Sequence, residues 1–375
     1  MRFWALSYFL SAALLCVVTS CGLFCAQEIR SGPWVMQESG TTAGLRGIHA
    51  VGGGVAWASG TNGTVLRTED GGYVWQRCAM PPGAEKLDFR GIWAWDQNTA
   101  MVMSSGPGEL SRIYKTTDGC SHWKLIFTNP DKDGFWDAMV FSDPRNGFLL
   151  GDPVRGHFAL LRTENGGDTW SFVQSQDLST EGRRRLGAFA ASNSAMVLTG
   201  PVLGPVCAPW FGTGGPDGPW VYSGGVDCTM GLAHSQPESC LQHWVFERAK
   251  LPMSGENASS GVFSLSSRGH GHAVAVGGDY SKPNESVGTA AWTADGGKHW
   301  TAAEMPPHGY RSAVAWDSEA KAWIAAGTNG SDISFDGGKT WSPLDDGNWN
   351  ALSLPWVVGS KGSIAKLDAW KLPKE

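Results

Sequence analysis

The sequence is poor in charge and lacks the patterns of long helices. Only 17% of its 375 residues are Asp, Glu, Lys or Arg. After the first 26 residues, no segment repeats apolar residues at positions i, i+3 and i+4 between capping residues. The formal net charge of -6 excludes the basic footprint of a nucleic-acid-binding protein. No Cys and His residues stand at the spacing of a zinc site, so we expect neither a metal nor a cofactor.

Glycine and tryptophan are the residues that the chain has in excess. It contains 51 glycines and 20 tryptophans. Glycine-containing turns separate short runs of aromatic and β-branched residues, a pattern that favours an all-β fold.

The first 26 residues differ in character from the rest. Arg2 is the only charge before the apolar run from Phe3 to Val18, as in an export signal. Val18-Thr19-Ser20-Cys21 resembles the bacterial lipobox, whose cysteine is lipidated after cleavage. The alternative is an ordinary signal peptide cut near Ser20 or Ala26. In either case we expect residues 1–26 to be a signal and the mature protein to be exported. It would be a periplasmic or cell-envelope lipoprotein, or a secreted protein.

Five cysteines follow the export segment, and an exported context permits disulfides. They are Cys78, Cys120, Cys207, Cys228 and Cys240. The last three fall in one irregular stretch, where we expect a local bridge. Spacing alone leaves the pairing open, and an odd number leaves at least one thiol free.

One short motif occurs five times, with an acidic residue or Asn, one or two glycines and a tryptophan at fixed offsets. Its paired positions are Asp70 and Trp75, Asp118 and Trp123, Asn165 and Trp170, Asp295 and Trp300, and Asp336 and Trp341. Most copies lie forty-odd residues apart, a period typical of propeller blades or solenoids. We interpret the one long gap, between Asn165 and Asp295, as two further units that lost the motif.

A second landmark, an alternating apolar run, precedes each unit. Seven such starts lie in the ranges Leu45 to Thr68, Phe89 to Ser105, Phe135 to Pro153, Leu186 to Pro201, Ser260 to Gly278, Tyr310 to Gly327 and Asn348 to Leu367. Each unit is consistent with four short antiparallel strands, the pattern of a propeller blade.

The two ends of the chain complement each other. The seventh unit stops after its third strand, Ser363 to Asp368, and the mature N-terminus supplies a lone fourth strand, Gly32 to Gln37. Pairing them would close a ring and remove an exposed sheet edge. We therefore predict an all-β fold, a closed seven-bladed β-propeller over residues 32–371. We expect an irregular insert at about 201–242, as a long loop over blades 4 and 5. Six or eight blades remain alternatives because residues 201–252 are irregular.

We interpret the motif as a structural element that stabilises a hairpin turn. Its acidic side chain can accept hydrogen bonds from the backbone of its own turn, glycine permits a positive φ, and the tryptophan buries a large apolar area. Equivalent acids on separate blades cannot form the close pair that acid–base catalysis needs. Asn165 also replaces the acid in one copy.

The motif resembles the Asp-box, or bacterial neuraminidase repeat. The longer unit, with Gly60 to Gly72 ("GTNGTVLRTEDGG"), resembles the photosystem II stability and assembly factor family. That resemblance implies a non-enzymatic propeller that acts as a chaperone or scaffold. The box is shared with sialidases, xyloglucanases and non-enzymatic propellers.

Propeller topology places the boxes on one face and directs the search for a site to the other. The starts of first strands and the loops between second and third strands meet on that box-free face. The candidate binding residues there are Arg46, Arg90, Arg311, Trp136, Asp137, Asp152, Arg155, Asp279 and Tyr280. The three arginines occupy one repeated slot and would suit carboxylate, sulfate or an acidic peptide. The alternative is that each stacks on a neighbouring blade as a repeat residue.

An enzyme is the alternative to a binding protein. Sialidases carry an Arg-Ile-Pro sequence, which is absent here, and the xyloglucanase pattern needs two propellers. Asp137 and Asp152 could pair, but both belong to one blade. We expect an exported monomer that binds a protein or anionic partner at the channel mouth. Any membrane contact would be only through a lipid at Cys21. A glycoside hydrolase acting on extracellular glycans is the alternative.

Overall fold

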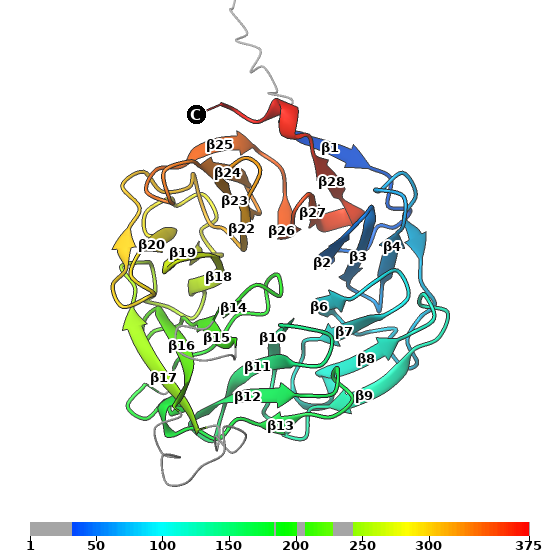
Figure 1. The fold of residues 1–375 in the computed structure, drawn as a ribbon, viewed down its shortest axis with the longest axis horizontal. Coiled ribbons are helices and arrows are strands. Elements are labelled where there is room, and N and C mark those ends of the chain that lie inside the picture. The colour runs from blue at the N-terminus through cyan, green and yellow to red at the C-terminus, as the bar shows by residue number, and fades with distance from the viewer. Residues whose placement is uncertain (1–31, 184, 201–206, 228–242, 375) are drawn as a thin grey trace, which may run out of the picture. The chain divides into compact units, whose positions relative to one another are not determined.

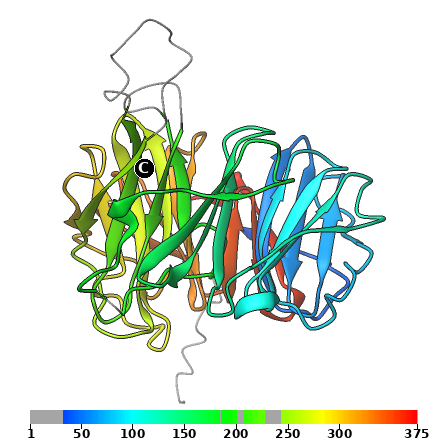
Figure 2. The same ribbon diagram turned by 90° about the horizontal axis from the view of Figure 1, so that it is seen from below.

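The computed structural model describes residues 32–374, apart from 184, 201–206 and 228–242. The described residues form seven four-stranded antiparallel sheets arranged around a central axis (Figure 1). In six of these sheets the first strand in the chain lies nearest the axis and the last at the rim, and Figure 2 shows the ring from the side. The predicted all-β, seven-bladed propeller is confirmed.

Blades 1 to 3 follow one another along the chain. Blade 1 is β2 (Leu45–Gly52), β3 (Val55–Gly60), β4 (Val65–Thr68) and β5 (Gln76–Arg77). Blade 2 is β6 (Phe89–Ala94), β7 (Ala100–Ser104), β8 (Arg112–Thr116) and β9 (Lys124–Thr128). Blade 3 is β10 (Trp136–Phe141), β11 (Gly147–Val154), β12 (His157–Thr163) and β13 (Ser171–Phe172).

Blades 4 to 6 complete most of the ring. Blade 4 is β14 (Met196–Thr199), β15 (Ala208–Gly212), β16 (Trp220–Asp227) and β17 (His243–Lys250). Blade 5 is β18 (Ser260–Gly269), β19 (His272–Asp279), β20 (Ala290–Thr293) and β21 (Thr301–Ala302). Blade 6 is β22 (Ala313–Asp317), β23 (Ala322–Gly327), β24 (Gly330–Ser334) and β25 (Ser342–Asp345).

Blade 7 is built from both ends of the chain, as predicted. It contains β26 (Trp349–Ser353), β27 (Trp356–Gly359), β28 (Ile364–Leu367) and, at the rim, β1 (Trp34–Gln37). The register pairs Trp34 with Leu367 and Gln37 with Ile364. The indole of Trp34 donates a hydrogen bond of 2.9 Å to the Ser331 hydroxyl of blade 6. The ring is therefore closed by strand pairing and by a side-chain bond to the preceding blade.

Short 3-10 helices are the only helical elements that the structure places in the described ranges: η1 (Gly108–Leu110), η2 (Gln176–Leu178), η4 (Ser360–Gly362) and η5 (Ala369–Lys371). None of the helices in this part of the chain is long and apolar enough to cross a membrane.

Blade 4 departs from the sequence prediction. Strands β15 and β16 lie within residues 201–242, where we expected an irregular loop, and they are the second and third strands of the blade. Phe211 and Tyr222 stack at 4.9 Å in its buried core. Only this blade lies between the boxes of Asn165 and Asp295, so the expectation of two motif-free units is wrong. Strands β16 and β17 pair as far as Asp227 and His243. The other parts of the expected insert, residues 201–206 and 228–242, lie outside the described residues.

Apolar packing between neighbouring blades holds the ring together. One buried cluster joins Trp57 and Val65 of blade 1 to Phe89 and Tyr114 of blade 2. Trp123 of the second box contacts Trp57 edge-on, with ring centroids 6.5 Å apart. Burial of one such ring contributes about 2–3 kcal/mol. The box tryptophan is therefore a contact between blades as well as part of its own hairpin.

The boxes close their own turns with hydrogen bonds. In blade 1 the Thr68 hydroxyl donates to Asp70 Oδ1 at 2.9 Å, and the Val74 amide donates to the same oxygen at 3.0 Å. Asn165 serves equally well, because its Oδ1 accepts from Thr163 Oγ1 and from the Thr169 amide, both at 3.0 Å. The bonding requires an acceptor oxygen and does not require a charge.

The box turn lies beside the first hairpin turn of its blade. The Gly71 amide donates to the Gly54 carbonyl at 2.9 Å, and the Gly296 amide donates to the Gly271 carbonyl at 3.0 Å. Boxes and first hairpin turns therefore share one face. Strand starts and the loops between second and third strands lie on the opposite, box-free face.

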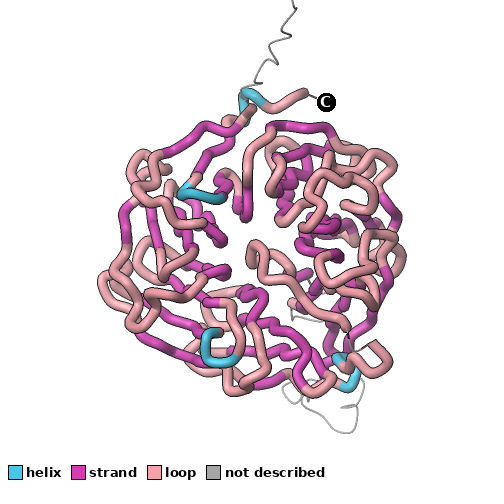
Figure 3. The backbone as a smooth tube through the Cα atoms, turned by 180° about the vertical axis from the view of Figure 1, so that it is seen from behind, coloured by secondary structure: helices cyan, strands magenta, loops and turns pink. Residues whose placement is uncertain are grey.

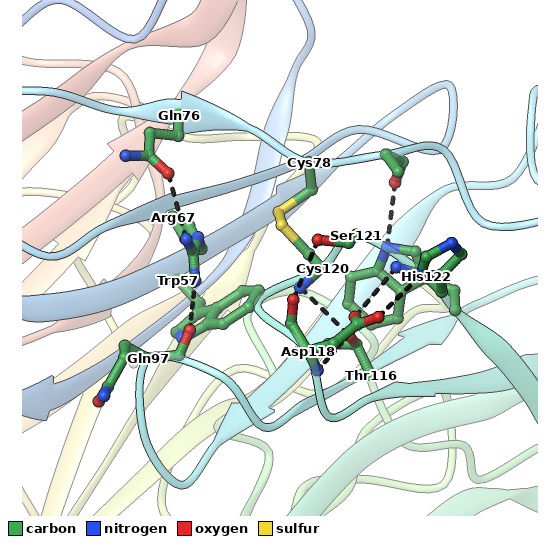
Figure 4. Close-up of a disulfide and its surroundings, with 12 residues drawn as sticks. Trp57, Arg67, Gln76, Cys78, Gln97, Thr116, Asp118, Cys120, Ser121 and His122 are labelled. Carbon is green, nitrogen blue, oxygen red and sulfur yellow. Dashed lines mark hydrogen bonds and ion pairs between the residues drawn. A yellow bond between two sulfur atoms is a disulfide. The ribbon is translucent and has the colours of Figure 1, made fainter.

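A disulfide joins blades 1 and 2. Cys78 follows β5, and Cys120 lies in the box of blade 2 beside Thr116, Asp118 and His122 (Figure 4). Cys207 is free. The local bridge expected around it would involve Cys228 or Cys240, which lie outside the described residues, and the structure shows none at Cys207.

Candidate binding site at the channel mouth

A loop of blade 4 fills the centre of the ring. Residues 187–195, here called the central loop, precede β14 and extend to the middle of the ring (Figures 1 and 3). The Ser192 hydroxyl donates to the Ser312 carbonyl of blade 6 at 2.6 Å, and the hydroxyls of Ser194 and Ser264 lie 2.7 Å apart. The central loop thus bonds to the next two blades of the ring, blades 5 and 6.

Asn193 fixes the other side of the central loop. Its amide donates to the carbonyls of Met139 at 2.9 Å and Ile92 at 3.3 Å, and its Oδ1 accepts from the Met139 amide at 2.8 Å. Its φ of 64° is uncommon for a residue with a side chain. We expected residues from Leu186 onward to form the first strand of blade 4, but that strand begins only at Met196. Hydrogen bonds from the central loop to other blades replace the strand pairing that we expected for these residues.

Arg46 and Arg90 share one carboxylate on the box-free face. Arg90 Nε lies 2.8 Å from Asp88 Oδ2, and Arg46 Nε lies 3.9 Å from Asp88 Oδ1. Their side chains are 34% and 29% exposed, respectively. Burial lowers the pKa of Arg46, Asp88 opposes this, and Arg90 reinforces it. Two guanidinium groups and one carboxylate leave one positive charge in excess, partly shielded from water.

Arg90 also supports the central loop. Its Nη1 donates to the Ala190 carbonyl at 3.2 Å. The arginine pair and the central loop therefore form one connected structure, with the loop as the floor of the mouth.

Aromatic rings lie beside the arginine pair. Phe189 of the central loop stacks on Phe263 at 3.8 Å, and Tyr310 meets Phe263 edge-on at 4.8 Å. Phe189 directly precedes Ala190, whose carbonyl accepts from Arg90. Burial raises the pKa of Tyr310, whereas the charges of Arg46 and Arg90 act in the opposite direction. Tyr280 is 52% exposed and lies 6.0 Å from Phe263. We call Arg46, Asp88, Arg90, Phe189, Phe263, Tyr280 and Tyr310 the mouth site.

Arg311 is placed differently from the other two arginines. It is fully buried, and its Nε lies 2.6 Å from Asp332 Oδ2. Its Nη1 also donates to Asn329 Oδ1 at 2.6 Å and to the Tyr310 carbonyl at 2.7 Å. With its donors engaged inside blade 6, Arg311 is a structural residue, and the expectation that it lines an open patch is wrong.

Asp137 and Asp152 both belong to blade 3 but have separate surroundings. Asp137 is 1% exposed, and its Oδ2 has no hydrogen-bond partner among the described residues. Burial, with Asp152 adding to it, raises the pKa of Asp137 well above the ordinary value, and Arg90 opposes this. Burial raises the pKa of Asp152 to about 6, although its Oδ1 accepts from the Ala188 amide at 2.9 Å. One acid is buried and the other holds the central loop, so they do not flank an open space for a glycosidic bond.

The remaining sequence candidates lie around the mouth site. Trp136 is buried and stacks on Phe127 at 6.0 Å. Arg155 is exposed on the turn between β11 and β12 and pairs with Asp131 at 3.2 Å. Although burial would raise the pKa of Asp279, hydrogen bonds from Ser259, Ser281 and Asn257 hold it well below the ordinary value.

Sequence reasoning missed four members of the mouth site: Asp88, Phe189, Phe263 and Tyr310. Asp88 stands two residues before Arg90, so both side chains lie on the same side of an extended chain. That spacing could have indicated from sequence that the two residues pair. The rings come from three blades, so only the folded ring brings them together. Within the described residues, no three His, Cys, Asp or Glu side chains gather as a metal site.

Comparison with known proteins places this geometry among propellers. A model of the BNR/Asp-box repeat matches residues 332–343, which confirms the box. No curated protein sequence matches the chain. The fold is similar to that of YCF48 bound to D1 peptide, with a TM-score of 0.58, 18% identity, and coverage of 89% of this chain and 96% of that chain.

Two further solved structures share the fold. YCF48 from Cyanidioschyzon merolae has a TM-score of 0.57 and 18% identity, with 90% of this chain and 99% of that chain covered. The WD40 β-propeller domain of Doa1 has a TM-score of 0.54 and 11% identity, with 89% and 95% covered. The resemblance to the photosystem II assembly factor is thus borne out as a likeness of fold, in a chain that carries an Asp-box repeat.

Proposed function

We propose that this chain is a non-enzymatic propeller that binds a polypeptide partner by an anionic segment at the mouth site. The observation that carries the proposal is the sharing of one carboxylate, Asp88, by Arg46 and Arg90. The excess positive charge is half-buried, so its attraction for a carboxylate is less screened than at an open surface. The guanidinium fork suits a carboxylate, and Tyr280 offers an exposed ring for apolar atoms beside it.

The likeness to other propellers supports a polypeptide as the partner. YCF48 is known with a bound D1 peptide, and the domain from Doa1 is a WD40 propeller. A rigid ring with one site at its mouth is suited to a scaffold or assembly factor, which holds a partner without transforming it.

The proposal includes export of the protein. Residues 1–26 would be the signal, with a lipid anchor at Cys21 or a cut near Ser20 or Ala26. The Cys78–Cys120 disulfide supports this, because structural disulfides persist mainly outside the cytoplasm.

A fluorescent acidic peptide tests the mouth site. The probe is a short peptide of alternating Glu and Ala with a free C-terminal carboxylate, and its affinity is measured by fluorescence anisotropy. We expect the double variant Arg46→Gln, Arg90→Gln to bind the probe about tenfold more weakly or worse, since each charged hydrogen bond contributes about 1.5–3 kcal/mol. Binding should also weaken as salt is raised.

The matched control removes two exposed cations from the box face. Lys298 and Lys321 are both exposed, and the variant Lys298→Gln, Lys321→Gln should bind the probe as the parent does. Equal affinity for the probe in the arginine variant and the parent would overturn the proposal. So would an arginine variant whose loss of binding only follows a loss of thermal stability.

A further inference from the structure

A groove of about 630 Å³ crosses blade 5 on the box-free face. Its lining includes one end of every strand of the blade: Ser260 begins β18, Asp279 ends β19, Ala290 begins β20 and Ala302 ends β21. Because these strands run in order from the axis to the rim (Figure 1), the groove extends outward across the blade. Tyr280 of the mouth site follows Asp279 directly, so the groove begins where the mouth site ends.

The walls of the groove are held by hydrogen bonds. On one side, the amide and the hydroxyl of Ser254 donate to the carbonyls of Gly288 and Val287, both at 3.0 Å. On the other, the Glu304 amide donates to the Lys339 carbonyl of blade 6 at 2.8 Å, and the Met305 carbonyl accepts from Trp341 at 2.8 Å. A groove fixed before binding costs little conformational entropy when a ligand enters it.

The groove is acidic. Four carboxylates line it, from Glu256, Asp279, Glu285 and Glu304, against one cation, Lys282. Lys282 is already paired with Glu285 at 3.2 Å. Glu256 and Glu304 are exposed, and neither side chain makes an ion pair or hydrogen bond with another residue in the described ranges. Two carboxylates are therefore available to a cation from outside.

Apolar side chains accompany these charges. Val287 lines the groove and is 81% exposed, and Met305, next to the lining residues Glu304 and Pro306, is 61% exposed. An exposed apolar surface within an acidic groove suits an amphipathic ligand better than a free metal ion or a sugar.

Resting on the proposed function, we infer that the groove is the outer half of the same binding surface. It holds an extended polypeptide segment with a Lys or Arg side chain, adjoining the anionic segment held at the mouth site. The charge of the groove is opposite to that of the arginine pair, so the surface orients the polypeptide: acidic at the axis and basic toward the rim. Opposed charges of this kind contribute mainly to specificity and to the rate of association.

Two probe peptides separate the two halves of the surface. The basic probe is a short peptide of alternating Lys and Ala that ends in an amide, and the acidic probe is the one described above. In the variant Glu256→Gln, Glu304→Gln we expect affinity for the basic probe to fall roughly fivefold, as for two partly exposed ion pairs. Affinity for the acidic probe should stay at the parent value.

The control variant is Glu109→Gln, Glu319→Gln, which removes the same charge from exposed positions in blades 2 and 6. A change of less than about twofold in the groove variant, or an equal change in the control, overturns the inference. Absence of basic-probe binding to the parent does so too. A parent protein that binds the basic probe but not the acidic probe overturns the proposed function and leaves the groove standing, so the two failures are distinguishable.

Discussion

Cys120 occupies the position that glycine holds in the other four boxes, and its sulfur is bonded to Cys78 of the preceding blade. Its φ is 64°, and the glycines at the equivalent positions, such as Gly72 and Gly338, also have positive φ. The amide of Cys120 still donates to Thr116 Oγ1 at 3.1 Å. Blade 2 thus keeps the box turn while using a strained residue to bind its neighbour covalently.

The first prediction compares two ways of removing this disulfide. Cys120→Ser should lower the free energy of unfolding by about 3–4 kcal/mol, because the crosslink closes a loop of 42 residues between its ends. Cys120→Gly should lose about 1 kcal/mol less, because glycine adopts the positive φ without strain. Denaturant unfolding of the two variants measures the difference. Equal stability of the two would show that the backbone at Cys120 carries no strain.

The second prediction concerns Arg311. Replacement by Met should lower the free energy of unfolding by about 3–5 kcal/mol, because buried Asp332 would lose its ion pair with Arg311 and keep only the hydrogen bonds from His308 among the described residues. Adding Asp332→Asn should restore part of the loss, since the uncompensated charge is then gone. Thermal and urea unfolding test both variants. A stable Arg311→Met protein that no longer binds the acidic probe would instead assign Arg311 to the mouth site.

The third prediction is a dependence of stability on pH from Asp152. Its pKa is raised to about 6, so the unfolded chain releases this proton at a lower pH than the folded chain. Its contribution is therefore fully favourable below the unfolded pKa and is lost as the pH rises from about 4 through 6. The variant Asp152→Asn keeps an acceptor oxygen for Ala188 and removes the titration. Its stability relative to the parent should rise by the order of 2 kcal/mol over this interval.

Urea unfolding at several pH values between 4 and 7 measures the effect. The comparison with the parent cancels groups that do not interact with Asp152, such as Asp118, whose pKa is lowered to about 2 chiefly by its hydrogen bond with His122. A constant difference across the interval would contradict the role given to Asp152.

The repeated motifs made most of the fold predictable from sequence, because the residues of each box are enough to predict a hairpin turn at that position. Trp34, alone at the N-terminus, could be assigned to the last blade for the same reason. Strands β15 and β16 of blade 4 could not be predicted, since Pro209, Gly224 and Gly225 resemble loop residues. Its strands are held by the packing of Phe211 and Tyr222 against Phe158 of blade 3, which no local pattern reveals.

The site was only partly visible from sequence for a related reason. Arg46 and Arg90 follow the start of equivalent strands, and spacing alone places them side by side. The environment of Arg311 depends on Asp332 and Asn329, which lie further along the same blade and carry no motif. Phe189 joins the site through the central loop, whose path across the ring is set by contacts with four other blades.

The closing strand has a consequence for biosynthesis. β1 is the first strand of the propeller to be made, yet its pairing partner β28 is the last. Until synthesis reaches Ile364, the ring is an open arc with unpaired strand edges at both ends. Such edges recruit other chains, so the nascent protein needs protection from association until β28 has been made. Truncation of the last strand should leave the whole arc prone to aggregation.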